Sequence, residues 1–227
     1  MCGFVGFTNY IKDDGTVINA MMDKIVHRGP DSAGFYTDAD IALGFRRLSI
    51  IDLSEGNQPM FNEDGSLVLV FNGEIYNFKD LRQELEAQGH TFANNSDSEV
   101  LLHGYEQWGE DLVKRLRGMF AFVIYNKADG SVFGARDMFG IKPFYYTVTE
   151  NTFMFGSEIK SFLAHPEFEK QLNEEALAHY LSFQYSPTEE TFFKGVYKLP
   201  PAHYFTFKNG KMKKTRYFRP DFKATPG

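Results

Sequence analysis

The stretch Met119-Phe-Ala-Phe-Val-Ile-Tyr-Asn-Lys-Ala-Asp-Gly-Ser-Val-Phe-Gly-Ala-Arg136 joins two apolar runs through a polar turn that ends in glycine. The runs Met119–Tyr125 and Ser131–Arg136 have the length and the aromatic and β-branched content of strands, and Asn126–Gly130 has the composition of a hairpin turn. Because a hairpin pairs its two strands in opposite directions, this stretch predicts an antiparallel sheet.

Outward from this hairpin, the sequence predicts more short strands and a few helices. Leu67–Phe71 is continuously apolar, as expected of a strand that is covered on both faces. The helices occur in small groups between hairpin-linked strands, without strict strand–helix alternation. This order predicts an α+β layered architecture with largely antiparallel sheets. The other predicted strands are Gly3–Thr8, Ile41–Phe45, Phe144–Thr147, Thr152–Phe155 and His203–Phe207; the predicted helices are Val17–Val26, Phe78–Gln88 (ended by Gly89), Ser98–Trp108 (with Ser96 and Glu99 spaced as a capping box) and Asn173–Phe183.

Composition narrows the class of protein. The 227 residues are 43% hydrophobic and 16% aromatic, which indicates a soluble globular chain with a ring-rich core. The net charge of −6 does not favour nucleic-acid binding, which needs clustered cations. The start of the chain has no signal-peptide pattern, no apolar run is long enough to span a bilayer, and a single cysteine excludes internal disulfides. These features favour the cytoplasm.

One basic run flanks Asn209-Gly210 and is interpreted as the solvated side of a hairpin: Lys208, Lys211, Lys213, Lys214 and Arg216.

Cys2 is the strongest candidate for chemistry. A lone cysteine is more often an inert buried side chain than a nucleophile. At position two, however, removal of Met1 would leave a thiol and a free α-amine on the same residue. An α-amine, with an ordinary pKa of about 7.7–8.0, can accept a thiol proton near neutral pH without a separate histidine. This is the logic of N-terminal nucleophile enzymes.

An acyl-transfer site also needs oxyanion donors and groups that hold the substrate, and three further positions are candidates. Asn72-Gly73 can offer a side-chain amide and a backbone N–H, although Asn-Gly between apolar runs is also the strongest short hairpin signal. Arg47 can bind a carboxylate, or Arg46-Arg47 can be a solvent-facing pair on a strand edge. Asp97 can accept from an ammonium group, or can cap a helix.

Taken together, the motifs of the chain resemble the class II glutamine amidotransferase domain, and most closely the N-terminal half of glutamine-dependent asparagine synthetase. The resemblance covers essentially the whole chain in order. The motifs that carry it are Met1-Cys-Gly-Phe-Val-Gly6, His27-Arg-Gly-Pro-Asp-Ser32, Arg47-Leu-Ser-Ile-Ile-Asp52, Asn72-Gly-Glu-Ile-Tyr-Asn77, Ser96-Asp-Ser-Glu99, Arg117-Gly-Met-Phe-Ala-Phe122, Arg136-Asp-Met-Phe-Gly-Ile-Lys-Pro-Phe144, Gly156-Ser-Glu-Ile-Lys160 and Lys198-Leu-Pro-Pro-Ala-His203.

The resemblance implies a role for each candidate residue. Cys2 would be the nucleophile, and Asn72 and Gly73 would form the oxyanion hole. Arg47 would bind the α-carboxylate of glutamine, and Asp97 its α-ammonium. It also implies a four-layer αββα sandwich over residues 1–217, with 218–227 as a linker toward an absent C-terminal ATP-dependent synthetase domain. The remaining substrate-binding positions that it implies are Leu48, Ser49, Ile50, Ile51 and Glu74.

The resemblance further implies partners and cofactors. The expected partners are L-glutamine and an ammonia-accepting synthetase domain in the full-length protein, with a homodimer as an open alternative and with neither nucleic acid nor membrane. No Ser-Gly-Gly pyrophosphate loop or Gly-x-x-x-x-Gly-Lys loop occurs, so ATP and Mg²⁺ are expected only in the absent domain. The six histidines have no i, i+4 pair or similar ligand spacing, and no metal is expected.

Three alternatives stay open. The ammonia acceptor can differ from that of asparagine synthetase. The chain can also be a regulatory domain that keeps the fold without turnover, which a retained Met1 would favour. An unrelated hydrolase that uses Ser157 and Lys160 as a serine–lysine pair is disfavoured, because the partner motifs of that class are absent.

Overall fold

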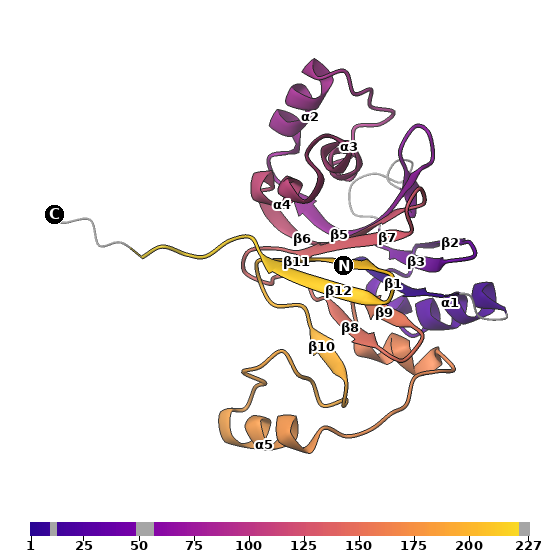
Figure 1. The fold of residues 1–227 in the computed structure, drawn as a ribbon, viewed down its shortest axis with the longest axis vertical. Helices are drawn as coiled ribbons and strands as arrows, with labels where there is room; N and C mark the ends of the chain where they lie inside the picture. Colours follow the sequence, from indigo (N-terminus) through magenta and orange to yellow (C-terminus); the bar gives the residue numbers. More distant parts are fainter. Residues whose placement is uncertain (10–12, 49–56, 223–227) are drawn as a thin grey trace.

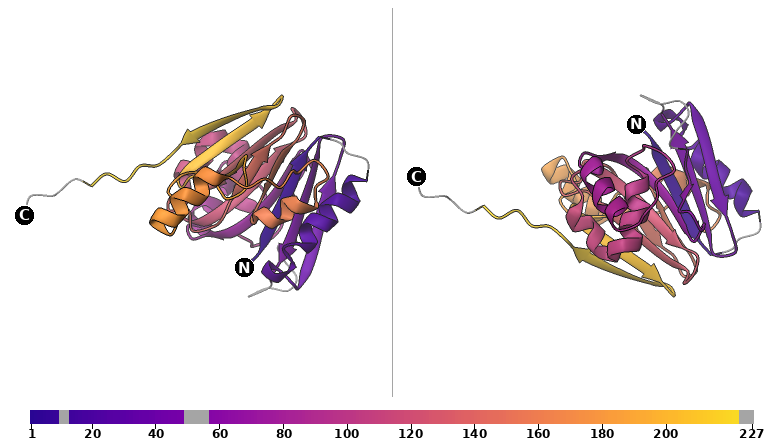
Figure 2. Two further views of the ribbon diagram at one scale, coloured as in Figure 1. Left: turned by 90° about the horizontal axis from the view of Figure 1, so that it is seen from below. Right: turned by 90° about the horizontal axis from the view of Figure 1, so that it is seen from above.

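The structure is a computed structural model that describes residues 1–9, 13–48 and 57–222. Two six-stranded sheets lie face to face, and helices cover their outer faces (Figure 1; Figure 2). Every strand pairing within these sheets is antiparallel. The predicted α+β sandwich with antiparallel sheets is therefore confirmed.

The first sheet has the strand order β10-β8-β9-β1-β3-β2, and the second has the order β12-β11-β7-β6-β5-β4. The strands of the first sheet are β1 (Gly3–Thr8), β2 (Ser32–Thr37), β3 (Ile41–Arg47), β8 (Tyr145–Val148), β9 (Phe153–Gly156) and β10 (Val196–Lys198). Those of the second are β4 (Met60–Phe61), β5 (Leu67–Ile75), β6 (Gly118–Asn126), β7 (Ser131–Arg136), β11 (His203–Lys208) and β12 (Lys211–Arg216). The helices are α1 (Asp14–Asp23), α2 (Phe78–Ala87), α3 (Glu99–Trp108), α4 (Leu112–Arg115) and α5 (Glu174–Phe183), with 3₁₀ turns η1 (Val26–Arg28), η2 (Gly109–Asp111) and η3 (Ile159–Ala164).

The central strand β5 shows why the fold has four layers. Successive side chains of a strand point to opposite faces. Val68 and Val70 pack into the core between the two sheets, whereas Leu69 and Phe71 pack on the other side against the helices. A strand whose two faces both enter a core must be apolar throughout. The prediction that Leu67–Phe71 is covered on both faces is confirmed.

The outer layers are helical. Leu81, Leu85 and Val100 of α2 and α3 pack against the second sheet, and Ile18 and Met21 of α1 pack against the first. Helix α5 is different, because Ala176 is its only buried residue, and it extends away from the sandwich (Figure 1). None of the helices in the described ranges is long and apolar enough to cross a membrane.

Both predicted hairpins are present. Strands β6 and β7 pair across the turn at Asn126–Gly130, and β11 and β12 pair across Asn209-Gly210. The two turn residues have φ values of 51° and 70°, as this type of tight hairpin requires. The basic side chains of β12 are exposed, as the solvated-hairpin interpretation expects.

Some local predictions were wrong. Ser96 and Glu99 do not form a capping box, because α3 begins after Ser98 and the Glu99 carboxylate accepts instead from the backbone N–H groups of Ala93 and Asn94. Helix α1 begins at Asp14 and ends at Asp23, earlier than predicted at both ends. The strands β2, β4 and β10 were not predicted, since each is short or has few apolar residues.

Candidate functional site

A cavity of about 270 Å³ lies where β1 begins and β5 ends, at one end of the space between the sheets. It brings together residues that are far apart in the sequence, and several predicted site residues are among them. Its lining consists of Met1, Cys2, Phe45, Arg47, Gln58, Phe71, Asn72, Gly73, Glu74, Ser96, Asp97, Ser98, Met119 and Lys142. Among the predicted positions that the structure describes, only Leu48 is outside this lining, and it contacts Cys2.

Cys2 lies directly before β1, and its side chain packs against the edge of the core between the sheets. The backbone of Leu48 lies beside the sulfur: its N–H is 3.4 Å from Sγ and its carbonyl oxygen 3.7 Å. Leu48 directly follows β3, which pairs with β1. The pairing of these two strands therefore places the thiol next to the chain segment that follows Arg47.

Arg28 holds the backbone of Cys2 in place, a role that the sequence did not predict. Its Nε donates to the carbonyl oxygen of Cys2 at 3.0 Å, and its Nη1 donates to Glu158 Oε1 at 3.0 Å. The next position must be glycine, because a Cβ at Gly29 would lie 2.3 Å from the backbone of Arg46. The motif that begins at His27 thus anchors the first residues of the chain, a function that only the fold reveals.

One edge of β5 pairs with β6, and the other edge pairs with β4 only at Val68 and Leu69. Beyond β4, this second edge presents backbone N–H donors. The Phe71 N–H donates to Gln58 Oε1 at 2.6 Å, and the Ile75 N–H donates to Asp97 Oδ2 at 2.8 Å. Amides two residues apart in a strand point the same way, so the N–H of Gly73 points to this same edge, between Gln58 and Asp97. The hairpin interpretation of Asn72-Gly73 is wrong, because both residues lie inside β5 and pair with β6.

Asn72 is a buried amide with an unused donor. Its side chain is only 2% exposed, and Nδ2 has no hydrogen-bond partner in the part of the chain that the structure describes. Its position in β5 is even-numbered, like those of Val68 and Val70, so it points to the space between the sheets where Cys2 packs. A buried N–H without a partner costs about 1–3 kcal/mol, which points to a functional reason for its retention.

Gly73 is required by packing as well as by its place in the cavity. A Cβ at this position would lie 2.3 Å from the carbonyl oxygen of Met119 and 2.7 Å from Cα of Phe120. Both are backbone atoms of the neighbouring strand β6, which cannot move aside at low cost. A residue with a side chain is therefore excluded where the strand edge faces the cavity.

Asp97 does not cap α3, because its carboxylate accepts from Ile75 of β5 and the N-cap position belongs to Ser98. Burial raises the pKa of the Asp97 carboxyl, the Ile75 N–H opposes that shift, and the nearby negative charge of Glu74 adds to it. The carboxylate therefore has a higher free energy than in water. A cation bound in the cavity would lower it.

Arg47 and Arg46 behave differently, although they are neighbours. Arg47 lines the cavity and reaches Asn57 Oδ1 at 3.3 Å, whereas Arg46 forms an ion pair with Asp23 of α1. The prediction of a solvent-facing pair on a strand edge is wrong, because β3 lies between β1 and β2 and both side chains are half-buried. Ser49, Ile50 and Ile51 lie outside the described residues.

Lys142 is a cavity residue that sequence reasoning missed. It is 7% exposed, and its Nζ lies 3.6 Å from Met1 Sδ. The buried carboxylate of Asp137 shapes the loop that carries it, since it accepts from four backbone N–H groups, including those of Phe120 and Lys142. The motif Arg136-Asp-Met-Phe-Gly-Ile-Lys-Pro-Phe144 contains this lysine, but only the fold places it beside the start of the chain.

The comparisons with known proteins agree with this geometry. The family model described as a glutamine amidotransferase domain matches residues 1–218. The chain is 46% identical over 229 residues to asparagine synthetase [glutamine-hydrolyzing] 1 of Bacillus subtilis (strain 168), with 98% of this chain and 36% of that protein covered. It is 38% identical to asparagine synthetase [glutamine-hydrolyzing] 3 of the same organism, with 96% and 36% covered.

Solved structures extend the comparison to the fold alone. The glutamine phosphoribosylpyrophosphate amidotransferase from B. subtilis, solved with ADP and GMP, superposes with a TM-score of 0.69. It shares 21% identical residues and covers 95% of this chain and 49% of that one. The chain spans about a third of the length of the two curated asparagine synthetases that it matches.

Proposed function

The chain belongs to the glutamine amidotransferase domain family, and from this membership we propose that it hydrolyses L-glutamine to L-glutamate and ammonia through a thioester on Cys2. The observation that carries this proposal is the cavity itself. One hollow collects the only thiol of the chain, a buried amide donor that has no partner among the described residues, and the opposite charges of Arg47 and Asp97.

In the proposed reaction, Met1 is first removed, which frees the α-amine of Cys2. This amine accepts the thiol proton, and the sulfur attacks the side-chain carboxamide carbon of glutamine. Asn72 Nδ2 and the Gly73 N–H donate to the oxyanion that forms on the carboxamide oxygen. The C–N bond then breaks, and ammonia leaves with a proton from the α-amine. Water hydrolyses the γ-glutamyl thioester to glutamate and restores the thiol.

The charged ends of the substrate fit the charges of the cavity. The guanidinium of Arg47 presents paired N–H donors that match the α-carboxylate. The Asp97 carboxylate is oriented by the Ile75 N–H and can accept from the α-ammonium. Leu48 and Glu74 would contribute backbone groups to the pocket, and the same role is proposed for Ser49, Ile50 and Ile51.

We further propose that the ammonia serves an ATP-dependent synthesis of asparagine from aspartate, carried out by a synthetase domain in the full-length protein. Support comes from the two Bacillus relatives, which are described as glutamine-hydrolysing asparagine synthetases and are almost three times longer than the matched segment. ATP and Mg²⁺ would act in that domain. The cytoplasm is proposed as the compartment, because the reaction needs a free thiol.

Incubation with glutamine alone tests the proposed reaction. After mass spectrometry has verified that Met1 is absent, the protein should release glutamate and ammonia in equal amounts without ATP. Failure of the chain alone and also of the full-length protein supplied with ATP and aspartate would refute the proposal. Asparagine is the product expected from the full-length protein, and a different amidated product would refute only the proposed acceptor.

Replacing Asp97 by asparagine should weaken glutamine binding more than it slows the chemical step. The asparagine keeps an acceptor for the Ile75 N–H but loses the charge that faces the α-ammonium. Hydrogen bonds to charged groups contribute about 1.5–3 kcal/mol, so we expect KM to rise by about 10- to 100-fold, with kcat changed much less. Steady-state kinetics with glutamine measure both. An unchanged KM would remove Asp97 from the substrate site.

The raised pKa of Asp97 predicts how activity and stability depend on pH. Binding of an ammonium needs the carboxylate, so kcat/KM should fall as the pH drops through a pKa above the ordinary aspartate range, and Asp97→Asn should lose this limb. Without substrate, the Asp97 carboxyl binds its proton more tightly in the folded chain than in the unfolded chain. Asp97 therefore stabilises the fold at pH values below its pKa in the unfolded chain, and this stabilisation is lost as the pH rises through its pKa in the folded chain. Ligand-free Asp97→Asn should therefore melt no lower than the wild type at neutral pH.

A further inference from the structure

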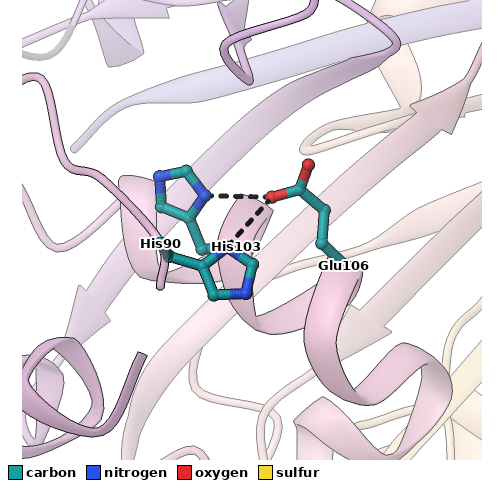
Figure 3. A group of neighbouring side chains, drawn as sticks. All are labelled: His90, His103 and Glu106. Atoms are coloured by element: carbon teal, nitrogen blue, oxygen red, sulfur yellow. Dashed lines mark hydrogen bonds and ion pairs between the residues drawn. The ribbon is translucent and has the colours of Figure 1, made fainter. Parts of the chain in front are cut away.

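Two histidines and a glutamate lie close together beside α3, away from the cavity of Cys2. His90 follows α2, whereas His103 and Glu106 lie one turn apart on α3. Glu106 Oε2 lies 2.9 Å from His103 Nδ1 and 3.7 Å from His90 Nδ1 (Figure 3). All three potential ligand atoms lie within 4.8 Å of one another, the only such group among residues 1–9, 13–48 and 57–222.

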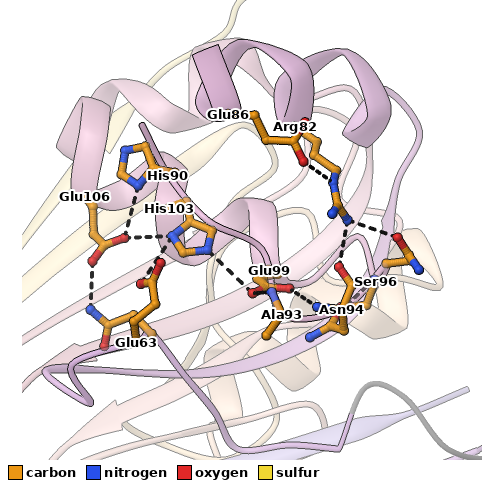
Figure 4. Close-up of polar contacts among 12 residues, drawn as sticks. Glu63, Arg82, Glu86, His90, Ala93, Asn94, Ser96, Glu99, His103 and Glu106 are labelled. Carbon is orange, nitrogen blue, oxygen red and sulfur yellow. Dashed lines mark hydrogen bonds and ion pairs between the residues drawn. The ribbon is translucent and has the colours of Figure 1, made fainter. Parts of the chain in front are cut away.

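These separations suit a tetrahedral metal ion. With metal–ligand distances of about 2.0–2.1 Å, the ligands of a tetrahedral zinc ion lie about 3.3 Å from each other. The distances of 2.9 and 3.7 Å bracket this value. Glu63 Oε2 lies 3.7 Å from His103 Nδ1 on the exposed side (Figure 4), but Glu63 is outside the group of atoms that all lie within 4.8 Å of one another and is not counted as a ligand.

The second nitrogen of the His90 ring has an oxygen acceptor. His90 Nε2 is 3.1 Å from Gln107 Oε1. His103 Nε2 lies 3.6 Å from Glu99 Oε1 and has no hydrogen-bond partner among the described residues. Metal-binding histidines commonly donate this second N–H to a carboxylate or carbonyl oxygen, which fixes the ring and leaves the other nitrogen's lone pair for the metal. In both rings Nδ1 is the nitrogen that faces Glu106.

The group also has an excess of negative charge. Three carboxylates, those of Glu63, Glu99 and Glu106, lie within 3.7 Å of the imidazole of His103, which is only 1% exposed. A divalent cation would offset this negative charge, and a set of two imidazoles with a carboxylate suits zinc among the common divalent ions.

We propose that His90, His103 and Glu106 bind one zinc ion. The ion connects two segments: the loop after α2 and α3 itself. The loop after α2 runs on to Asp97, so the metal fixes the end of the segment that carries this cavity residue. Three protein ligands leave the fourth position of a tetrahedral ion open to solvent. The spacing of the histidines along the chain did not predict this site, because His90 lies outside the helix that carries His103 and Glu106.

Zinc binding to the Cys2→Ser protein tests the proposal. This background removes the only thiol, which would otherwise compete for zinc. Equilibrium dialysis with metal analysis should find one bound zinc ion, and the melting temperature should rise with zinc concentration. Cobalt substitution should give the absorption of a tetrahedral site without a sulfur-to-metal band.

Variants identify the ligands. His90→Ala and Glu106→Gln should lose the bound ion and its effect on melting, and both positions are partly exposed, so neither change threatens the core. Gln107→Ala should weaken zinc binding by about 10- to 100-fold through the ring orientation of His90. His179→Ala, an exposed histidine on α5, is the matched control and should bind zinc like its parent.

Two results would overturn the proposal. One is the absence of saturable zinc binding to the Cys2→Ser protein. The other is equal zinc affinity in His90→Ala and His179→Ala, which would mean that the ion binds elsewhere. Neither result would bear on glutamine hydrolysis, which is measured separately on the protein with Cys2 intact.

Discussion

Replacing Cys2 by alanine is expected to reduce glutamine hydrolysis by about 10⁴-fold or more. The sulfur is the atom that forms the thioester, and removal of an enzyme nucleophile commonly costs about 10⁴–10⁶ in kcat. Within the described residues, no other side chain that lines the cavity is a thiol, and its two serines, Ser96 and Ser98, lie beside Asp97 on the substrate-binding side. No second thiol is therefore available to form the thioester.

The measurement separates chemistry from binding. Release of ammonia from glutamine gives the loss of turnover, and calorimetric titration should show that Cys2→Ala still binds glutamine, because Arg47 and Asp97 are untouched. Wild-type turnover by Cys2→Ala would refute the assignment. A matched test keeps the thiol and removes the base: a protein that retains Met1 has an amide at Cys2 in place of the α-amine and should be inactive although its sulfur is intact.

The strands could be predicted from the sequence because their apolar pattern and their turns are local. Leu67–Phe71 is apolar on both faces, and Asn209-Gly210 has the conformation that its turn demands. The same reasoning from local sequence failed at Asn72-Gly73. This dipeptide is a strong turn signal, but both residues lie within β5, which pairs with β6 at nine consecutive positions. The stabilisation from this long strand pairing outweighs the local turn preference.

The site could be predicted only as a set of residue types, because its geometry depends on contacts between distant elements. Cys2, directly before β1, and Asn72 of β5 line one cavity because β1 and β5 belong to the two sheets that face each other across the sandwich. The Asp97 carboxylate accepts a hydrogen bond from the edge of β5 and does not cap α3, the helix that follows Asp97 along the chain. Arg28 and Lys142 were not assigned any role, since nothing in their neighbourhood along the chain indicates that they contact Cys2 and Met1.

Replacing Asn72 by alanine is expected to raise the barrier of hydrolysis by about 2.7–4 kcal/mol, which lowers kcat by about 10²–10³-fold with little change in KM. The reason is that Nδ2 would stabilise the oxyanion, which carries full charge only in the transition state and the intermediate. The folded protein should lose little stability, because Nδ2 has no partner to lose within the described residues.

Asn62→Ala is the matched control for this prediction, because Asn62 is also a buried asparagine next to β5. Its Nδ2 donates to Glu106 at 2.7 Å and to Ser66 at 3.1 Å, and its Oδ1 accepts from the Leu67 N–H at 2.9 Å. Asn62→Ala should therefore lower the melting temperature while kcat stays near the wild-type value, the reverse of the Asn72→Ala result. If Asn72→Ala instead lost stability and kept its kcat, the amide would serve the fold, and the oxyanion would need another side-chain donor. The contrast is decisive because burial is nearly the same at the two positions, and only the partners of the amide differ.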